Sequence, residues 1–290
     1  MEWLDRMKSA MDYIETHLDE EVDPAEAAKR ACCSVTHFQR MFSFITGIHL
    51  SEYIRRRRLT LAGFELQEGS AKVIDVALKY GYDSPEAFSR AFKQLHGIMP
   101  TAARSKGAAL KAFPRLSFHI SIRGDVEMNY RIEEKQPFMM AGLTADMDCA
   151  NGKQYADIPK MWETGLADGS LERLSTHFGL DKNKDMLHAA LYNFRERFFT
   201  YMIGAVVPVD AEVGGFAVLE VPALTWAIFP TGEHTDEETT EAIQAVWKRI
   251  YPEWFPTSGY EHADGPEFEM YHNLGNGRYV SEVWIPVVKK

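Results

Sequence analysis

Hydrophobic residues recur every three or four positions through the first hundred residues, a spacing that predicts amphipathic helices. One run covers residues 3–18, and a longer one covers residues 51–67. Between and after these runs, Ser34 and Ser84 stand where a helix N-cap is expected, because serine accepts a hydrogen bond from the first turn. We therefore predict that this part of the chain is all-α.

A repeat at a spacing of fifty residues divides the helical part into two similar units. Each unit predicts a short helix, a tight turn and a second helix, which a serine caps and a glycine ends. In each second helix, two phenylalanines four positions apart share the buried face, so polar neighbours point outward. The repeated residues are Ser34, Phe38, Arg40, Phe42, Gly47 and Ile48, which recur as Ser84, Phe88, Arg90, Phe92, Gly97 and Ile98.

The predicted helix over residues 51–67 joins the two units. A helix of this length spans roughly 25 Å at 1.5 Å per residue. Together with the flanking units, it can place two helices in neighbouring major grooves, which are about 34 Å apart. The pattern thus favours a double helix-turn-helix module.

From about residue 126, alternating apolar and polar positions replace the helical spacing, which predicts strands. The segments predict an α+β domain, and their order indicates two strand-helix-strand-strand repeats with a ligand cleft between them. The predicted strands are 126–134, 138–145, 187–193, 199–207, 216–221, 224–230, 267–273 and 279–287, with helices at 154–168 and 236–251.

The charge distribution changes the first impression of an acidic protein. The 290 residues carry a net charge of −10, which argues against a nucleic-acid partner, since phosphate contacts need lysine and arginine. However, residues 27–106 carry +7, whereas residues 1–26 carry −7 and residues 107–290 carry −10. This asymmetry is typical of one segment that docks on phosphates. We expect a DNA-binding domain at 1–106, a linker at 107–125 and an effector-binding domain at 126–290.

Composition also indicates the cellular compartment. No segment approaches the roughly 20 apolar residues of a membrane span, and the N-terminus lacks the profile of a signal peptide. Three cysteines cannot all pair internally, which suits a reducing compartment. We expect a cytoplasmic protein without a membrane partner, cofactor or metal, in which Cys32 and Cys33 are packing residues.

The motifs of the two units carry a specific resemblance. The first unit contains Ser34-x-x-x-Phe38-x-Arg40-x-Phe42, and the second contains Val73-x-x-Val76-Ala77-x-x-x-Gly81-Tyr82. Over residues 3–106 the chain resembles the AraC/XylS family of transcription regulators. The resemblance implies that one helix of each unit enters the major groove, where arginine can bond guanine and glutamine can bond adenine. By position, the implied base-facing residues are Thr36, Gln39 and Arg40, and Glu86, Ala87 and Arg90.

Two departures from the pattern affect these expectations. The first turn has Cys32 where the second has Gly81, so the two turns need not share one geometry. Glu86 and Ala87 are poor phosphate binders, so we expect the first unit to contribute more base readout. The alternative for Arg40 and Arg90 is a solvated or salt-bridged arginine. The run from Arg55 to Arg58 covers a full helical turn, so we expect one or two of these to touch phosphate and the rest to be structural or solvated.

In the last predicted strand, alternation places Glu282 between Val280 and Trp284 on one face. A buried carboxylate without a partner is costly, so a cation supplied by a ligand would explain it, aided by cation–π contact with tryptophan. The alternative is a solvent-exposed sheet edge at which Trp284 merely packs. The candidate ligand-binding residues are Trp162, Tyr192, Trp226, Tyr271, Glu282 and Trp284.

A second resemblance concerns this half. The run Pro266-Glu267-Phe268-Glu269-Met270-Tyr271, followed by Ser281-Glu282-Val283-Trp284-Ile285-Pro286-Val287, resembles the gyrase-inhibitor-like (GyrI-like) effector-binding domain over roughly 126–288. The resemblance implies lipophilic, often cationic, ligands and places the family's pocket glutamate on Glu282.

The favoured hypothesis is a transcription regulator whose C-terminal half senses a small hydrophobic or cationic effector. Its expected partners are double-stranded DNA and the effector, with RNA polymerase as a further candidate. An enzyme that uses Glu282 as a general base is the alternative, but no catalytic triad, metal-ligand spacing or phosphate loop supports it. An architectural DNA binder with an inert second half is a third hypothesis.

Overall fold

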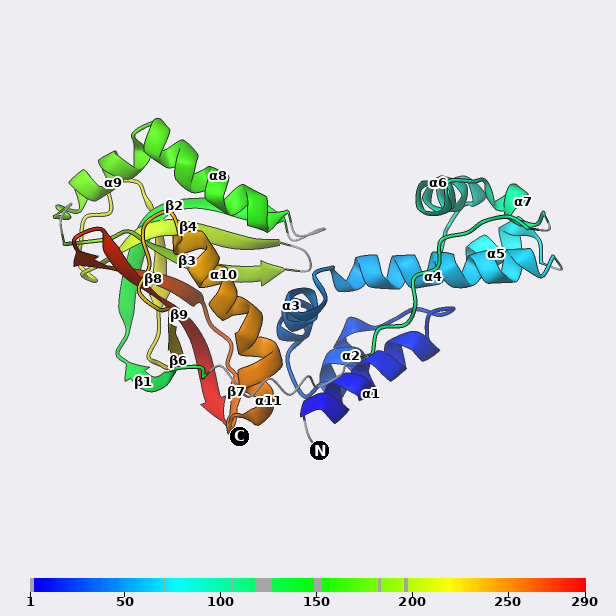
Figure 1. Cartoon of the computed structure of the whole chain (residues 1–290), viewed down its shortest axis with the longest axis horizontal. Helices are drawn as coiled ribbons and strands as arrows, with labels where there is room; N and C mark the ends of the chain where they lie inside the picture. The colour runs from blue at the N-terminus through cyan, green and yellow to red at the C-terminus, as the bar shows by residue number, and fades with distance from the viewer. Residues whose placement is uncertain are drawn as a thin grey trace. The chain divides into compact units, whose positions relative to one another are not determined.

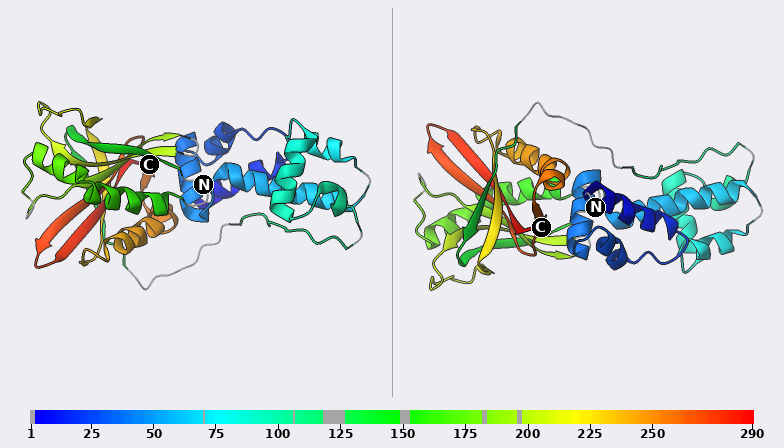
Figure 2. Two further views of the ribbon diagram at one scale, coloured as in Figure 1. Left: turned by 90° about the horizontal axis from the view of Figure 1, so that it is seen from above. Right: turned by 90° about the horizontal axis from the view of Figure 1, so that it is seen from below.

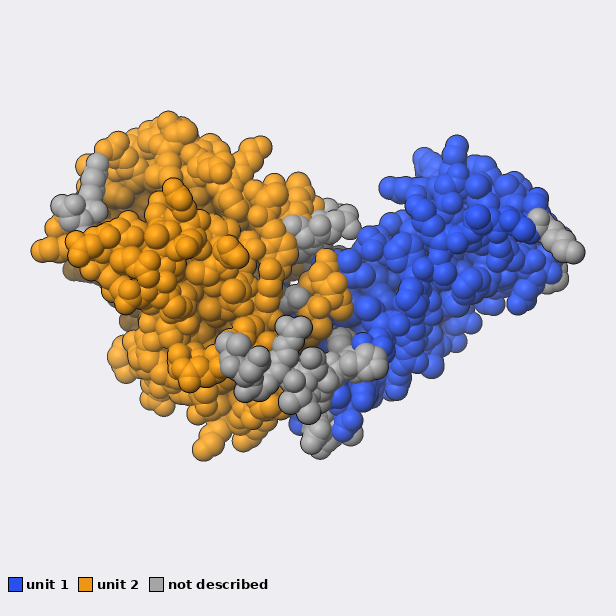
Figure 3. Space-filling view, in the orientation of Figure 1, with its two compact units in different colours: residues 1–42, 48–121 blue, residues 43–47, 122–290 orange. Residues whose placement is uncertain are grey.

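The computed structural model describes residues 3–69, 71–105, 107–117, 127–148, 153–181, 184–195 and 198–290. The chain forms two compact units, residues 1–42 with 48–121 and residues 43–47 with 122–290 (Figure 3). The first is helical and the second contains the sheet, which confirms the predicted all-α and α+β halves.

The helical unit follows the predicted order (Figure 1). Asp23 accepts a hydrogen bond from the Ala25 amide at 2.8 Å and begins α2, and Ser84 does the same for α6 through the Ala87 amide at 3.1 Å. Gly97 ends α6 in the left-handed conformation, at φ 84°. The helices are α1 (Trp3–Thr16), α2 (Pro24–Arg30), α3 (Val35–Thr46), α4 (Leu50–Gln67), α5 (Val73–Lys79), α6 (Pro85–His96) and α7 (Pro100–Ala103).

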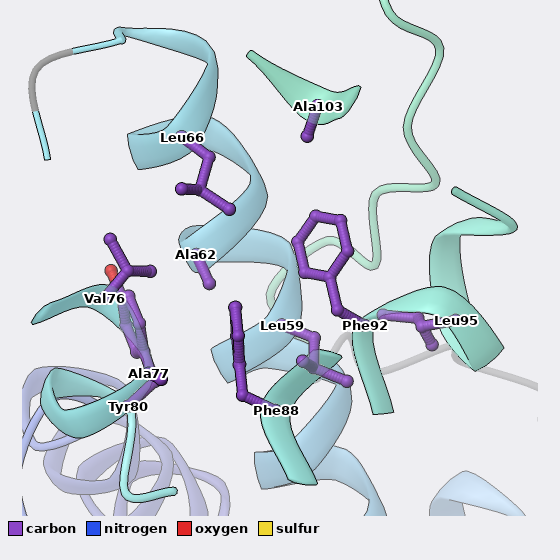
Figure 4. Packing of buried hydrophobic residues seen from close by; sticks show 10 residues of the cluster. All are labelled: Leu59, Ala62, Leu66, Val76, Ala77, Tyr80, Phe88, Phe92, Leu95 and Ala103. Atoms are coloured by element: carbon purple, nitrogen blue, oxygen red, sulfur yellow. The ribbon is translucent and has the colours of Figure 1, made fainter. Parts of the chain in front are cut away.

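The core around α6 explains why the repeat contains paired phenylalanines. Phe88 and Phe92 are fully buried on one side of α6 and pack against α4 and α5 (Figure 4). Burying side chains of this size stabilises the unit by about 1.5–3 kcal/mol each. The cluster comprises Leu59, Ala62, Leu66, Val76, Ala77, Tyr80, Phe88, Phe92, Leu95 and Ala103.

Residues 107–117, which we call the strap, extend along the helical unit. Leu110 and Phe113 of the strap pack against the same cluster. The Phe113 amide donates to Thr60 Oγ1 at 3.1 Å, and the Leu116 amide donates to the Tyr53 hydroxyl at 3.1 Å. The described part of the expected linker is therefore held along α4 by side chains and hydrogen bonds.

The second unit is an antiparallel sheet in the order β1-β6-β9-β8-β3-β4-β2-β5, with the short β7 paired to β9. The sheet is strongly twisted (Figure 2). Its strands are β1 (Arg131–Lys135), β2 (Phe138–Asp148), β3 (His188–Arg195), β4 (Phe198–Val207), β5 (Ala217–Val221), β6 (Leu224–Pro230), β7 (Tyr260–His262), β8 (Glu267–Gly275) and β9 (Arg278–Lys289).

Helices follow the second and sixth strands. The predicted helix at 154–168 is α8 (Gln154–Ala167), and the one at 236–251 is α10 (Thr239–Arg249), which continues as a π-helix over Ile250–Trp254 and α11 (Phe255–Thr257). The sequence pattern did not predict α9 (Ser170–His177) or β7. The predicted strand at 126–134 begins only at Arg131, and residue 126 lies outside the described residues.

Candidate nucleic-acid interface and effector site

The two helix-turn-helix units, α2–α3 and α5–α6, have the same turn. Cys32 and Gly81 both adopt the left-handed conformation, at φ 56° and 77°. The Cys32 amide bonds the Lys29 carbonyl at 3.0 Å, and the Gly81 amide bonds the Leu78 carbonyl at 3.1 Å. The departure at Cys32 therefore does not change the turn, although a side chain in this conformation is strained.

The outward face of α6 carries the residues expected in the second unit. Glu86 and Arg90 are exposed and Ala87 is half-buried. Arg90 makes no ion pair with any residue that the structure describes. Lys93 is also exposed, and its place three residues after Arg90 puts it on the same face. The i+3 spacing from Arg90 was the signal that could have predicted Lys93.

In α3, Phe38 and Phe42 are fully buried, as predicted. Gln39 is buried and Arg40 is half-buried, and both have interaction partners. Thr36 belongs to the same helix, but its side chain lies outside the described part. The base-facing roles of these three residues stay predictions.

The four consecutive arginines of α4 have specific protein partners. Arg55 and Arg56 pair with Glu52 of the same helix, at 2.7 and 2.6 Å. Arg57 is buried and pairs with Glu15 of α1 at 2.8 Å, and it also donates to the Phe113 carbonyl of the strap at 2.6 Å. The hydrogen bonds that Arg57 donates to Glu15 raise the pKa of Arg57, so this guanidinium stays charged. At least the buried Arg57 is thus structural.

The sheet has two faces with different chemistry. One face, which we call the helix face, carries Glu267, Glu269 and Tyr271 of β8, and the helices α8 and α10 contact it through Trp162 and Trp247. The opposite face carries a buried apolar cluster. Its buried members are Met140, Ala190, Met202, Val221, Trp226, Ile228, Phe268, Met270 and Trp284.

Glu282 lies on the opposite face and has a basic partner. The expectation of a buried carboxylate without a partner, which pointed to Glu282 as a ligand site, was therefore wrong. Arg131 of β1 binds it with two nitrogens, at 2.7 and 3.1 Å, and the Trp284 indole donates to it at 2.8 Å. Burial would raise the pKa of Glu282, but hydrogen bonds from His272, Arg131 and Trp284 lower it to about 2. The face is not a solvent-exposed sheet edge either, because β9 lies between β6 and β8 and Trp284 is only 8% exposed.

Glu269, on the helix face, is a buried carboxylate without a cation partner among the residues that the structure describes. Its side chain accepts hydrogen bonds from Trp247 Nε1 at 2.8 Å and from the hydroxyls of Tyr201 and Tyr271, both at 3.1 Å. No basic residue pairs with it in the described ranges. Burial raises the pKa of Glu269, the neighbouring Glu267 raises it further, and the three donors oppose this shift.

A chain of aromatic residues connects Glu269 with the surface. Trp162 of α8 donates to the Tyr201 hydroxyl at 3.0 Å, which in turn donates to Glu269. The rings of Trp162 and Tyr271 meet edge to face, with centroids 5.6 Å apart, and both residues are only partly buried. Burial and the charge of Glu269 raise the pKa of both tyrosines well above their usual value, so they remain neutral donors.

The structure separates the six predicted ligand residues. Trp162 and Tyr271 lie on the helix face beside Glu269. The other four, Tyr192, Trp226, Glu282 and Trp284, lie on the opposite face. Glu269 was not among the predicted ligand residues, although the alternation of Glu267, Glu269 and Tyr271 with Phe268 and Met270 was the same kind of signal that pointed to Glu282.

Within the residues that the structure describes, no group of three or more histidine, cysteine, aspartate or glutamate side chains could hold a metal ion. The helices described here include none that is long and apolar enough to cross a membrane.

Comparisons with known proteins give matches for the helical unit and for the sheet unit. Residues 27–106 match a helix-turn-helix domain model, and residues 128–288 match the model of the GyrI-like small molecule binding domain. The transcriptional activator AarP of Providencia stuartii is 41% identical over 92 residues, which are 32% of this chain and 68% of AarP. The regulatory protein SoxS of Salmonella typhimurium is 34% identical over 34% of this chain and 94% of SoxS.

Other matches are partial or remote. The Right origin-binding protein of Escherichia coli (strain K12) is 37% identical over 32% of each chain. The solved structure of SAV2435 bound to tetraphenylphosphonium is 17% identical, covering 56% of this chain and 94% of that chain, with a TM-score of 0.44. The GyrI-like model covers more than half of the sequence. The chain therefore belongs to the GyrI-like family of small-molecule binding proteins and, through its helical unit, to the AraC-type regulators.

Proposed function

We propose that the protein is a sequence-specific transcription regulator that senses a lipophilic cation at Glu269. The observation that carries this proposal is a buried carboxylate held by three neutral donors and without a basic partner among the described side chains. Burying a charge without a countercharge is costly. A bound cation would supply that countercharge, so the site should favour positively charged ligands over neutral ones of the same shape.

The hydrogen bonds at Glu269 also limit which cations fit. A carboxylate offers about four acceptor positions, and Trp247, Tyr201 and Tyr271 use three of them. A primary ammonium has three N–H donors to satisfy and would lack acceptors here. A cation without N–H donors needs none, and it gains cation–π attraction from the aromatic rings. Trp162 and Tyr271, which are only partly buried, are the residues at which such a ligand would enter.

For DNA binding, we propose that α3 and α6 contact bases through the residues expected from the sequence. Arg90 and Glu86 of α6 are exposed, and Lys93 on the same face suits a phosphate. Gln39 and Arg40 are the corresponding candidates of α3, together with Thr36 and Ala87. RNA polymerase is a further proposed partner, since AarP, a relative of the helical unit, is a transcriptional activator.

We also propose that the sheet unit arose from two strand-helix-strand-strand repeats. The strand order supports this: from one edge it runs β5-β2-β4-β3, and from the other it runs β1-β6-β9-β8. In each half, the second strand of this order, β2 or β6, is followed along the chain by a helix, α8 or α10. The two inner strands of the same half come after that helix. Glu269 then lies beside the boundary between the halves, because β8 pairs with β3 there.

The test is calorimetric titration of the full chain with tetraphenylphosphonium, an aromatic cation without N–H donors, and with the neutral triphenylphosphine oxide. The wild-type chain should bind the cation more tightly. Glu269→Gln should weaken cation binding at least about tenfold, equivalent to about 1.4 kcal/mol. Affinity should rise as pH rises through the elevated pKa of Glu269, because the cation binds the ionised carboxylate, and this rise should vanish in Glu269→Gln.

Glu282→Gln is the matched control, since Glu282 lies in the same unit but on the opposite face and is bound by Arg131. It should keep cation binding. If Glu282→Gln lost the cation and Glu269→Gln kept it, the proposed site would be wrong. Equal affinity of the wild-type chain for cation and neutral probe would contradict the countercharge argument.

A further inference from the structure

Arg58 of α4 differs from the three arginines before it. Arg55, Arg56 and Arg57 have carboxylate partners, whereas Arg58 has none among the described residues. Its guanidinium instead donates to backbone carbonyls, from Nε to the Leu18 carbonyl at 2.8 Å and from Nη2 to the Glu20 carbonyl. These carbonyls lie between α1 and α2, immediately before the first helix-turn-helix unit.

The same guanidinium contacts the second helix-turn-helix unit. Gly81 forms the turn between α5 and α6, at φ 77°. A Cβ atom at Gly81 would lie 2.9 Å from Arg58 Nη1, which is closer than real Cβ contacts. The turn thus packs directly against the guanidinium. One side chain therefore contacts both the segment that leads into the first unit and the turn of the second.

The geometry of arginine makes this contact a rigid one. The guanidinium is planar, and its five N–H donors point in fixed directions, whereas a lysine ammonium is a single point on a flexible stem. Arg58 is half-buried, and desolvation lowers its pKa without removing its charge, because arginine is effectively always protonated. Its bonds to fixed backbone carbonyls restrict movement of one helix-turn-helix unit relative to the other.

We propose that Arg58 is a positioning residue that fixes the separation of α3 and α6, and so sets the spacing of the two DNA half-sites that one chain can occupy. The inference rests on the proposed binding of DNA by both helices. Adding one base pair between half-sites rotates them by about 34° and separates them by about 3.4 Å. A protein that holds α3 and α6 at a fixed separation cannot adapt to that change, whereas a protein in which the two helices can move relative to each other can.

The test starts from a binding site that the wild-type full chain selects from a pool of random duplexes. Duplexes with one or two base pairs added or removed between the half-sites are then titrated by fluorescence anisotropy. For the wild-type chain, one base pair should cost about tenfold in affinity. For Arg58→Lys, affinity at the selected spacing should fall and the difference between spacings should shrink to about threefold or less.

Arg55→Lys is the matched control, because Arg55 lies on the same helix and pairs within it; its spacing profile should keep the wild-type shape. Gly81→Ala disturbs the contact from the other side and should also flatten the profile, so the test does not depend on one variant. An unchanged profile in folded Arg58→Lys and Gly81→Ala would overturn the inference. A loss of affinity that is equal at every spacing would also overturn the inference if the slope of log affinity against log salt concentration fell by about one. That result would indicate that Arg58 contacts a phosphate.

These outcomes are distinct from failure of the DNA-binding proposal. A wild-type chain that selects no site with two half-sites would contradict that proposal itself. A selected two-part site with an unaltered Arg58→Lys profile would contradict only the role of Arg58.

Discussion

Arg90 is the side chain of α6 best placed to contact a base. It is exposed, and no carboxylate in the described ranges holds it. Phe88 and Phe92 anchor the other side of the helix in the core, so Arg90 must point away from the protein. An arginine in this situation can bond both acceptors of guanine in the major groove.

Arg90→Ala should therefore weaken binding to the selected duplex by about 1–3 kcal/mol and relax the preference at one base position. Lys93→Ala is the comparison, since a phosphate contact should weaken binding to all sequences about equally. Titrations of both variants against matched and mutated duplexes check this. Wild-type affinity in Arg90→Ala would show that α6 does not contact bases as proposed.

The two glutamates of the sheet unit show what the sequence could and could not reveal about single residues. Alternation correctly placed Glu282 and Trp284 on one face, because it depends only on neighbours in the strand. Its partner Arg131 lies 151 residues away in the sequence, so no local pattern predicts that pairing. Glu269 became a candidate only when the sheet brought Tyr201 to it and α10 brought Trp247.

At the scale of elements, the strap depends on His96, the last residue of α6. His96 is buried, its Nδ1 accepts the Lys111 amide of the strap at 3.2 Å, and its Nε2 contacts the Leu59 carbonyl at 3.0 Å. Because Nδ1 accepts, the proton belongs on Nε2, which donates to Leu59. Burial lowers the pKa of His96, and the charge of Lys111 lowers it further.

Strap attachment should therefore weaken in acid. The folded pKa of His96 lies below the ordinary 6.5, so the stability from neutral His96 is present above that value and is lost as pH falls below it. Protonation of Nδ1 removes the acceptor of the Lys111 amide, a bond worth about 0.5–1.5 kcal/mol. Hydrogen-exchange protection of residues 107–117, corrected for intrinsic rates, should fall between pH 7 and 5, and less so in His96→Gln. Equal protection at both pH values would contradict this.

The elements differed in how well the sequence predicted them. Asp23 and Ser84 act on their own helices, so the caps were visible in the sequence and the helices formed as expected. Strand positions followed alternation in the same way. The strap was not predicted, because Phe113 and Leu116 are fixed by Thr60 and Tyr53, more than fifty residues earlier. Sheet order likewise depends on pairings between distant strands.

At the scale of the whole molecule, the proposed regulation requires communication between a cation site in the sheet unit and DNA contacts in the helical unit. Such coupling means that the cation binds two states of the protein with different affinity, and that these states also differ in affinity for DNA. Trp162 of α8 and Trp247 of α10 both donate into the network of Glu269, so a cation bound there would act on these two helices of the sheet unit.

The most direct test of the central claim measures DNA affinity of the full chain with and without saturating tetraphenylphosphonium. The cation should change the affinity for the selected duplex about 5- to 150-fold, which corresponds to a typical coupling of about 1–3 kcal/mol. The change should disappear in Glu269→Gln. Identical DNA affinity in the presence and absence of the cation, while calorimetry shows it bound, would contradict the account.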